Sequence, residues 1–404
     1  MINNMNKFIK RIPRHLWSLI SLIFGLIIGS IYGESLRFIS SGTHSALTGF
    51  IKIVPILIYF TLAPAVNKLM SRGGGGKLAA SVIIWYLITS FFAGLVGLIF
   101  SSLLFNIELF SENGNMTNEV YKMFTTLTGD SISAALPIYA ILFAIITALF
   151  ATKFLRLQKI LNTFDYWMNN SFPYITMVMP LIVFFLGITL GVNTGATESI
   201  KNYFLMTCYT FFLCMCWLII YQLIVIKLFA KQSIRRVMSE YFFPTAIFAA
   251  GTCSSLATLP VNLENIKKYG VNPTIAGFVI PIGAIINLDT SALAYVAYAP
   301  FIMTIVFDIP ITLTALLIAW PAIVLFTVAA PGLPAGMGTA LWSSTLFASL
   351  LNFDEAQTSV FITTWIALSG GLPDMLRTAI NCTCDGFTAI FFNEKFAHYI
   401  EEDY

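Results

Sequence analysis

The sequence predicts an all-α integral membrane protein with eight transmembrane helices and two re-entrant helical hairpins inserted from opposite sides of the bilayer. The first observation is composition, because 58% of the 404 residues are hydrophobic and only 10% are charged, unlike a soluble domain. The second is that several apolar stretches reach the roughly 18 residues needed to cross a hydrocarbon core. The third is that basic and acidic clusters alternate between these stretches, as the positive-inside rule requires.

Six apolar segments in the N-terminal half predict membrane helices rather than barrel strands, because they are continuous and lack a period of two. Basic residues before the first segment place the N-terminus in the cytoplasm. No small-residue cleavage site follows, so we expect a retained helix and not a signal peptide. Basic clusters follow the second, fourth and sixth segments, whereas the loop at 107–130 is acidic and is expected outside. The segments span residues 16–33, 45–67, 78–106, 131–152, 168–192 and 203–230.

The next apolar stretch, residues 237–263, has basic residues at both ends, so both ends are expected on the cytoplasmic side. It is interrupted by CSSLATLP at residues 253–260, which combines small polar residues with a proline. The arm before the interruption has about 16 residues and is too short to span the bilayer. The stretch therefore predicts a first re-entrant hairpin.

Residues 272–307 are expected to cross outward as a seventh helix, and the stretch at 310–351 is flanked only by acidic residues. APGLPAGMG, residues 330–338, breaks that stretch and predicts a second hairpin entering from outside. A final helix over 356–393 returns the C-terminus to the cytoplasm. Oppositely inserted hairpins, each followed by a full helix, form an inverted repeat with a binding site near the midplane. We therefore expect an N-terminal domain, 1–230, and a C-terminal transport core, 231–396.

Four charged residues lie inside apolar segments of this core, namely Asp289, Asp374, Arg377 and Asp385. An ionised side chain at the bilayer centre costs at least roughly 2.5 to 3.5 kcal/mol, so each requires a reason. Ion pairing that only fastens helices is one explanation. Three acids facing one base, however, leave negative charge unpaired.

The last predicted helix carries a polar stripe, because its polar residues recur every three or four positions. Arginine offers a planar fork suited to a carboxylate, and spare carboxylates suit an ammonium group or a metal cation. The stripe is therefore expected to hold an anionic solute, a cation or both. It consists of Asp374, Arg377, Thr378, Asn381 and Asp385.

Three further polar groups lie in apolar surroundings. The stretch NLDTS at 287–291 offers carboxamide and carboxylate oxygens, which are hard ligands that suit Na+. Ser254 and Ser255, at the first hairpin tip, either present hydroxyl and N–H groups to an anion or only cap the short helical arms. The third group consists of Tyr86, Thr89 and Ser90. The spacing of these residues, taken alone, favours a role in helix packing over binding.

Composition also disfavours several other functions. The net charge of +3 is too small to suggest a nucleic-acid partner. The six cysteines lie within apolar segments, which favours small buried side chains over a disulfide framework. The three histidines fall near the ends of apolar segments, which disfavours a zinc site or a Ser–His pair in the membrane. We therefore expect no enzyme and no cofactor beyond a coupling ion.

Four stretches of the C-terminal half resemble motifs of the glutamate/aspartate transporter family, the dicarboxylate/amino acid:cation symporters, and the resemblance covers nearly the whole chain. SSLATLPV is similar to the serine-rich first hairpin tip and GAIINLDTS to the Asn-Met-Asp-Gly-Thr stretch. GLPAG is similar to the second hairpin tip and DMLRTAINCTCD to the final helix. The resemblance implies a homotrimer in the cell membrane, with a scaffold of helices 1, 2, 4 and 5. Helices 3 and 6 would join a mobile elevator domain.

On the solute side, the resemblance implies that Arg377 holds the side-chain carboxylate of the solute. Asp374, assisted by Thr378, would hold its amino group, and Asn381 and Ser255 would hold its α-carboxylate. Ser291 would orient the distal carboxylate. The implied hairpin-tip contacts are Ser254 in the first hairpin and Leu333 in the second, which closes over the solute.

On the cation side, the resemblance implies two sodium sites. One consists of Asn287, Asn381, Asp385 and the Gly283 carbonyl, and the other of Tyr86, Thr89, Ser90 and Asp289. The sequence departs from the family pattern at four positions, with Cys253 for an arginine, Gly370 for an aspartate, Leu288 for a methionine and Thr290 for a glycine. The selectivity of the pocket and the number of coupled cations therefore stay open.

The expected function is secondary active symport of an acidic amino acid (aspartate or glutamate), or a related dicarboxylate, driven by Na+. Proton coupling through Asp289 or Asp385 and a neutral amino acid as solute are alternatives. From other classes, a passive anion channel could use Arg377 as its selectivity charge, and an intramembrane aspartyl hydrolase could pair two aspartates. The hydrolase is disfavoured, because Arg377 would keep Asp374 ionised when a catalytic pair must share a proton.

Overall fold

The computed structural model is almost entirely helical, and no strand occurs among the residues that it describes. Four helical stretches within the described residues are long and apolar enough to cross a membrane: Ile20–Thr43, Ala80–Leu104, Thr197–Phe229 and Pro273–Val306. The all-helical prediction is therefore confirmed. The described residues are 14–43, 45–46, 56, 59–60, 63–64, 67, 76–108, 132–329, 337–351 and 353–401.

Several sequence predictions fall outside these residues. They include the basic N-terminal residues before position 14, most of the predicted helix at 45–67, and nearly all of the acidic loop at 107–130. The tip of the predicted second hairpin, with Leu333, also lies outside the described residues.

The N-terminal helices lie close to their predicted positions. They are α2 (Arg14–Tyr32), α4 (Gly76–Leu104), α6 (Ile132–Ala151), α7 (Leu155–Thr194) and α8 (Ala196–Tyr221). Helix α2 continues through the 3-10 turn η1 (Gly33–Leu36), and the π-helical segment η3 (Gln222–Phe229) extends α8. Helix α7 has 40 residues and begins well before the predicted start at 168. Its first turns carry Arg156, Gln158 and Lys159, which favour a helix but interrupt the apolar pattern.

Helices α2 and α7 pack closely because each carries a Gly-x-x-x-Gly motif. A Cβ atom at Gly25 or Gly29 would meet the backbone of α7, and one at Gly187 or Gly191 would meet the backbone of α2. Small residues at this spacing allow helices in a membrane to approach until their backbones touch. The four glycines therefore join two segments that lie about 160 positions apart.

The C-terminal half begins with a helical hairpin. Its first arm is continuous through α9 (Ile234–Val237), the π-helical η4 (Met238–Phe242) and α10 (Phe243–Thr252), and its second arm is α11 (Ser255–Tyr269). The break is narrower than predicted, because only Cys253, at φ +47°, and Ser254 interrupt the helix. Pro260 lies inside α11, beyond its first turn, where it removes only one backbone hydrogen bond.

Two predicted helices are each divided by a short break. The stretch at 272–307 forms α12 (Pro273–Ile286) and α13 (Asp289–Phe301), which continues into η5 (Ile302–Val306). The final stretch forms α16 (Glu355–Ser369) and α17 (Leu372–Glu401). Between these pairs lie α14 (Leu313–Ala329) and α15 (Met337–Leu350). Residues 287–288 and 370–371 therefore interrupt two stretches for which the sequence predicts one helix each.

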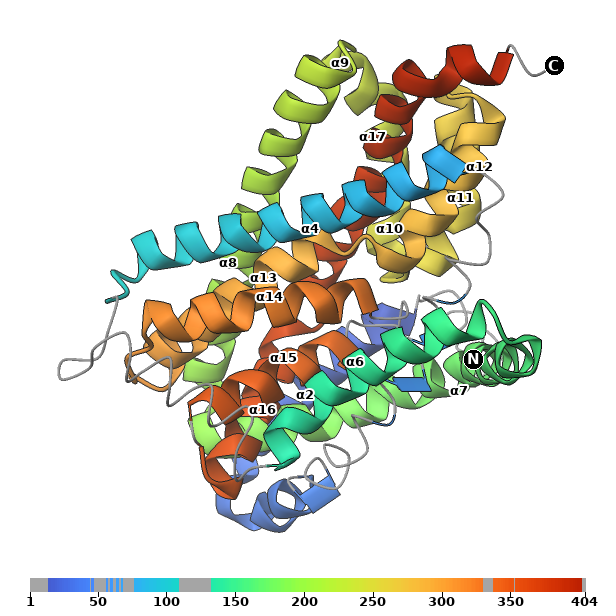
Figure 1. Cartoon of the computed structure of the whole chain (residues 1–404). Coiled ribbons are helices and arrows are strands. Elements are labelled where there is room, and N and C mark those ends of the chain that lie inside the picture. Colours follow the sequence, from blue (N-terminus) through green and yellow to red (C-terminus); the bar gives the residue numbers. More distant parts are fainter. Residues whose placement is uncertain are drawn as a thin grey trace, which may run out of the picture.

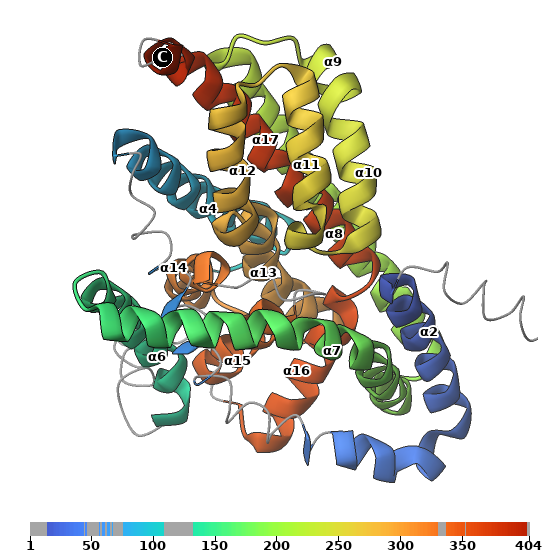
Figure 2. The ribbon, with the colours of Figure 1, turned by 90° about the vertical axis from the view of Figure 1, so that its right-hand side faces the viewer.

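Helix α17 is the centre of the C-terminal half, and it contacts α8, α10, α11, α12 and α13. Figure 1 shows it crossing the upper part of the molecule, and Figure 2 shows α10, α11 and α12 side by side around it. Tyr241 fastens the hairpin, since its hydroxyl donates to Asn262 Oδ1 at 2.7 Å while Asn262 Nδ2 donates to the Cys382 carbonyl of α17 at 2.8 Å. The hairpin tip and the break at 287–288 also border α17, through Ser255 beside Cys382 and Asn287 beside Asp385.

Candidate functional site

The polar residues predicted from the sequence converge on α17 and on the break between α12 and α13. The four charged residues are buried, and each residue is at most 5% exposed: Asp289, Asp374, Arg377 and Asp385. Because burial of a charge is costly without a partner, the contacts of each one determine what the site can do.

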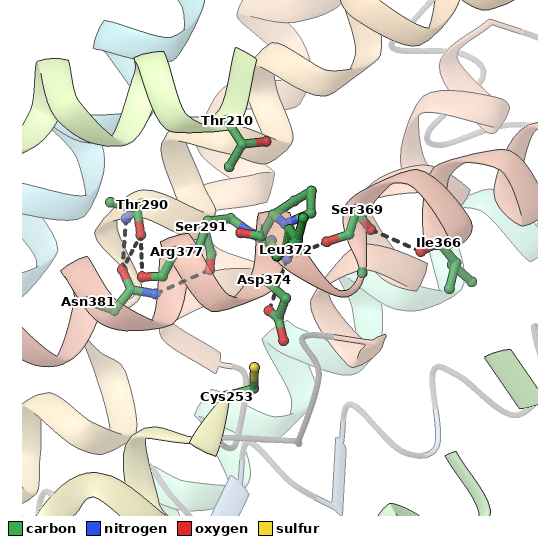
Figure 3. A network of polar contacts seen from close by, with 12 residues as sticks. Thr210, Cys253, Thr290, Ser291, Ile366, Ser369, Leu372, Asp374, Arg377 and Asn381 are labelled. Atoms are coloured by element: carbon green, nitrogen blue, oxygen red, sulfur yellow. Dashed lines mark hydrogen bonds and ion pairs between the residues drawn. The ribbon is translucent and has the colours of Figure 1, made fainter. Parts of the chain in front are cut away.

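Arg377 and Asp374 form an ion pair one turn apart on α17, with 3.0 Å between Arg377 Nη2 and Asp374 Oδ1. Arg377 Nη2 also donates to the Ser369 carbonyl at 3.0 Å (Figure 3), and Nε donates to the Pro373 carbonyl at 3.3 Å. Within the described residues, Asp374 Oδ2 and Arg377 Nη1 have no hydrogen-bond partner. The pair therefore retains one acceptor and one donor for a solute.

Two tyrosines of α13 enclose the guanidinium. Its central carbon lies 4.7 Å from the centre of the Tyr295 ring and 5.7 Å from that of Tyr298, which are cation–π distances. The Tyr298 hydroxyl shares a hydrogen bond of 2.7 Å with Thr210 Oγ1 of α8. Neither tyrosine was predicted as a site residue, although the YVAY stretch places the two rings on one helical face.

Asn381 is oriented by Thr290, a residue noted in the sequence only as a departure from a family glycine. The Thr290 backbone N–H and Oγ1 lie 2.9 and 2.7 Å from Asn381 Oδ1. The same hydroxyl lies 2.9 Å from the Arg377 carbonyl, so its one proton serves either acceptor. Asn381 Nδ2 consequently faces Ser291, at 3.4 Å from Oγ. The carboxamide therefore presents its donor, not its oxygen, on the side of Ser291.

The hairpin tip contributes two serines with different roles. Ser254 is the N-cap of α11, and its hydroxyl accepts a hydrogen bond from the Ala257 N–H at 3.3 Å. Ser255 is buried, with its hydroxyl 3.5 Å from the Cys382 thiol of α17. In Figure 3 the thiol of Cys253 points toward the carboxylate of Asp374. Because a thiol carries no positive charge here, Arg377 is the ionic partner of Asp374 in the described part of the chain.

Asp289 faces the polar patch of α4. Its Oδ1 accepts hydrogen bonds from Ser90 Oγ at 2.8 Å and Thr89 Oγ1 at 3.1 Å. Asp289 Oδ2 accepts none from the described residues. The patch, which spacing alone assigned to helix packing, thus contacts a buried carboxylate directly.

Asp385 lies on the other side of the α12–α13 break. Its Oδ1 accepts from Asn287 Nδ2 at 2.8 Å, while Asn287 Oδ1 has no partner among the described residues. A Cβ atom at Gly283 would collide with the Asp385 carboxylate and would lie 2.6 Å from the Tyr86 hydroxyl. Glycine therefore allows the backbone of α12, a carboxylate and a phenol to gather at one point.

The two carboxylates of this region, Asp289 and Asp385, form no ion pair with a described lysine, arginine or histidine. Hydroxyl, carboxamide and carboxylate oxygens surround them, which is the donor set that hard cations prefer. Thr378, the remaining predicted contact on α17, is buried beside Arg377.

Comparison with known proteins gives one family. A family model described as the sodium:dicarboxylate symporter family matches residues 15–395. The C4-dicarboxylate transport protein of Burkholderia cenocepacia (strain HI2424) is 24% identical over 313 residues, which cover 69% of this chain and 72% of that protein. C4-dicarboxylate transport protein 1 of Pseudomonas paraeruginosa is 23% identical over 376 residues, 84% and 81% of the two chains. A putative sodium-dependent excitatory amino acid transporter of Caenorhabditis elegans is 29% identical over 146 residues, 36% and 25%.

Proposed function

The chain belongs to the sodium:dicarboxylate symporter family, whose members are membrane transporters and not enzymes, and from this premise we propose that it imports an acidic amino acid together with Na+. The resemblance found in its sequence motifs is confirmed by this membership. Within the family, the solute and the coupling ion remain to be assigned from the chain's own residues.

The assignment of the solute rests on the Asp374–Arg377 pair. Arg377 Nη1 and Asp374 Oδ2 lie in one buried site with no hydrogen-bond partner among the described residues. An acidic amino acid fits this pair, because its side-chain carboxylate can accept from Arg377 while its ammonium donates to Asp374, assisted by Thr378. A plain dicarboxylate offers nothing to Asp374 and adds a second negative charge. We therefore favour aspartate or glutamate over the C4-dicarboxylates after which the bacterial relatives are named.

The α-carboxylate of the solute is assigned to the donor groups that remain. Asn381 Nδ2 is available on the side of Ser291, because Thr290 occupies the carboxamide oxygen. The hydroxyl of Ser255 lies against α17 from the hairpin tip. These two neutral donors would hold the α-carboxylate without placing a second buried cation in the site, while Ser291 would orient the distal carboxylate.

Na+ is proposed to bind at the two carboxylates that lack a basic partner. Asp289 with Tyr86, Thr89 and Ser90 would form one site, and Asp385 with Asn287 and the Gly283 carbonyl the other. Asn381 can contribute to the second site only through its backbone carbonyl, since Thr290 engages its side-chain oxygen. Protonation of the same acids is the alternative coupling mode.

The architecture proposed for transport is an elevator in a homotrimer of the cell membrane, with cytoplasmic termini. It is supported by the arrangement in Figures 1 and 2, where α6 and α7 lie below α10–α12 in both views and α4 contacts α12, α13 and α14. Helices α2, α6 and α7 would belong to the scaffold, and α4 and α8 to the mobile domain with residues 231–396. The second hairpin, with Leu333 at its tip, would be the outer gate.

Uptake by proteoliposomes tests this proposal. Labelled aspartate, glutamate, succinate and serine are supplied under an inward Na+ gradient, and in a parallel series under a proton gradient without Na+. We expect Na+-driven accumulation of aspartate and glutamate above their external concentration, which a passive channel cannot produce. Equal uptake without Na+, or uptake of serine alone, would refute the proposal.

A further inference from the structure

The break between α16 and α17 requires hydrogen-bond partners from outside these helices. Gly370 is extended and Gly371 has φ +64°, so the helix stops after Ser369 and restarts at Leu372. The first N–H groups of a helix and the last carbonyls of the preceding one have no intrahelical partner. Inside a membrane, each such group left alone costs several kcal/mol.

One hydroxyl from α8 joins the two sides of this break. Tyr203 OH accepts a hydrogen bond from the Leu372 N–H at 2.9 Å and donates one to the Gly370 carbonyl at 3.2 Å. A single phenol thereby satisfies the first donor of α17 and a carbonyl within the break. It fixes the distance between the end of α16 and the start of α17.

Arg377 takes its orientation from the same short segment of backbone. Two of the hydrogen bonds that its side chain makes within the described residues go to the Ser369 and Pro373 carbonyls, at 3.0 and 3.3 Å, on either side of the residues that Tyr203 bridges. Another goes to Asp374 in the first turn of α17. A shift of the break would therefore move both acceptors and turn the guanidinium away from its present direction.

We propose that Tyr203 is a positioning residue for the solute site, which holds the α16–α17 break in the geometry that aims Arg377 and Asp374 at the solute. This inference rests on the proposed function for its transport readout. The effect is on position and not on contact, because every hydrogen bond of the Tyr203 hydroxyl among the described residues goes to the backbone of the break. A direct contact of Tyr203 with the solute is not required.

The test compares Tyr203→Phe with Tyr209→Phe. Both lie on α8 and both variants remove one hydroxyl, but the Tyr209 hydroxyl is buried without a hydrogen-bond partner in the described part of the protein. In Tyr203→Phe we expect the KM for Na+-driven aspartate uptake to rise roughly tenfold, the value for about 1.4 kcal/mol, while the maximal rate changes less than twofold. Amide exchange of a peptide covering residues 370–376 should accelerate. Tyr209→Phe should match the wild type in both measurements.

Unchanged exchange at residues 370–376 in Tyr203→Phe would overturn the inference, as would accelerated exchange with an unchanged KM. A fall in maximal rate with the same KM would likewise contradict a positioning role. Failure of the proposed function is separate and appears in the wild type, which would then accumulate no acidic amino acid. The exchange comparison tests the bridge in either case.

Discussion

Replacing Asp374 by asparagine gives the sharpest test of the proposed solute, because the variant keeps the shape of the side chain and removes its charge. If Asp374 Oδ2 holds the solute ammonium, the loss of a hydrogen bond between charged groups costs about 1.5 to 3 kcal/mol. Since each 1.4 kcal/mol is about a factor of ten, the KM for aspartate should rise about 10- to 150-fold. Succinate has no ammonium group, so its KM should not rise with that of aspartate.

The same substitution should also change the stability of the solute-free protein. Asp374→Asn leaves the buried Arg377 without its ionic partner, and removal of one member of a buried pair destabilises a protein by about 3 to 5 kcal/mol. The solute-free variant should therefore unfold at a lower temperature than the wild type. A dicarboxylate supplies a replacement anion for Arg377, so succinate should raise the melting temperature of the variant more than that of the wild type.

The assay measures competitive uptake of aspartate and succinate by proteoliposomes, with thermal unfolding of the same preparations. Asp308→Asn is the matched control, because Asp308 is exposed and has φ +52°, a conformation that asparagine adopts readily. An equal change in KM for the two solutes, in a variant as stable as the control, would refute the assignment of Asp374 to the ammonium group.

Three other predictions concern the cations, the solute carboxylate and the fold. Asp289→Asn should raise the Na+ concentration for half-maximal uptake at least tenfold, because the hydroxyls of α4 would face a neutral amide. An unchanged Na+ titration would argue against a cation between Asp289 and α4. Thr290→Val should raise the KM for aspartate about two- to tenfold by removing one hydrogen bond to Asn381 or Arg377. Thr290→Ser keeps the hydroxyl and should have the KM of the wild type. Equal KM values for the two variants would contradict this reasoning. Gly29→Leu should lower the melting temperature, since its side chain would enter the α7 backbone at a cost of about 1 to 3 kcal/mol or more. Gly42→Leu should not, because no described atom outside its own helix lies within 4 Å of a Cβ placed at Gly42. Equal melting temperatures for the two variants would contradict the close packing of α2 and α7.

Much of the helical fold could be predicted, because the thickness of the bilayer sets the length of each apolar segment and the side of the membrane biases the charge of each loop. Helices α4 and α6 begin and end within two residues of their predictions. The breaks could not be predicted from hydropathy, since residues 287–288 interrupt a run that is apolar on both sides. At residues 370–373 a signal was present: two glycines followed by Leu372 and Pro373 are typical of a helix end and a new start.

The charged candidate residues and several polar ones could be proposed from the sequence, but Tyr203 and Thr290, which position other groups, could not. Asp289, Asp374, Arg377 and Asp385 stand out because a charge in an apolar segment is rare. Tyr203 and Thr290 act through hydrogen bonds to residues 167 and 91 positions away, respectively, and neither type is unusual in a membrane helix. Only the folded arrangement brings them to the backbone of the break and to the Asn381 carboxamide.

The buried negative charges of the pocket and of the solute together determine how many cations must accompany transport. Asp374 and Arg377 neutralise each other, so Asp289 and Asp385 leave two negative charges without an ionic partner among the described residues. On the proposed function, an acidic amino acid adds a third. At roughly 2.5 to 3.5 kcal/mol for each charge near the bilayer centre, the loaded pocket would meet a barrier of roughly 7 to 11 kcal/mol unless cations or protons accompany it. Coupling then follows from the buried carboxylates themselves, and Asp289→Asn should reduce by one the number of cations that each solute requires.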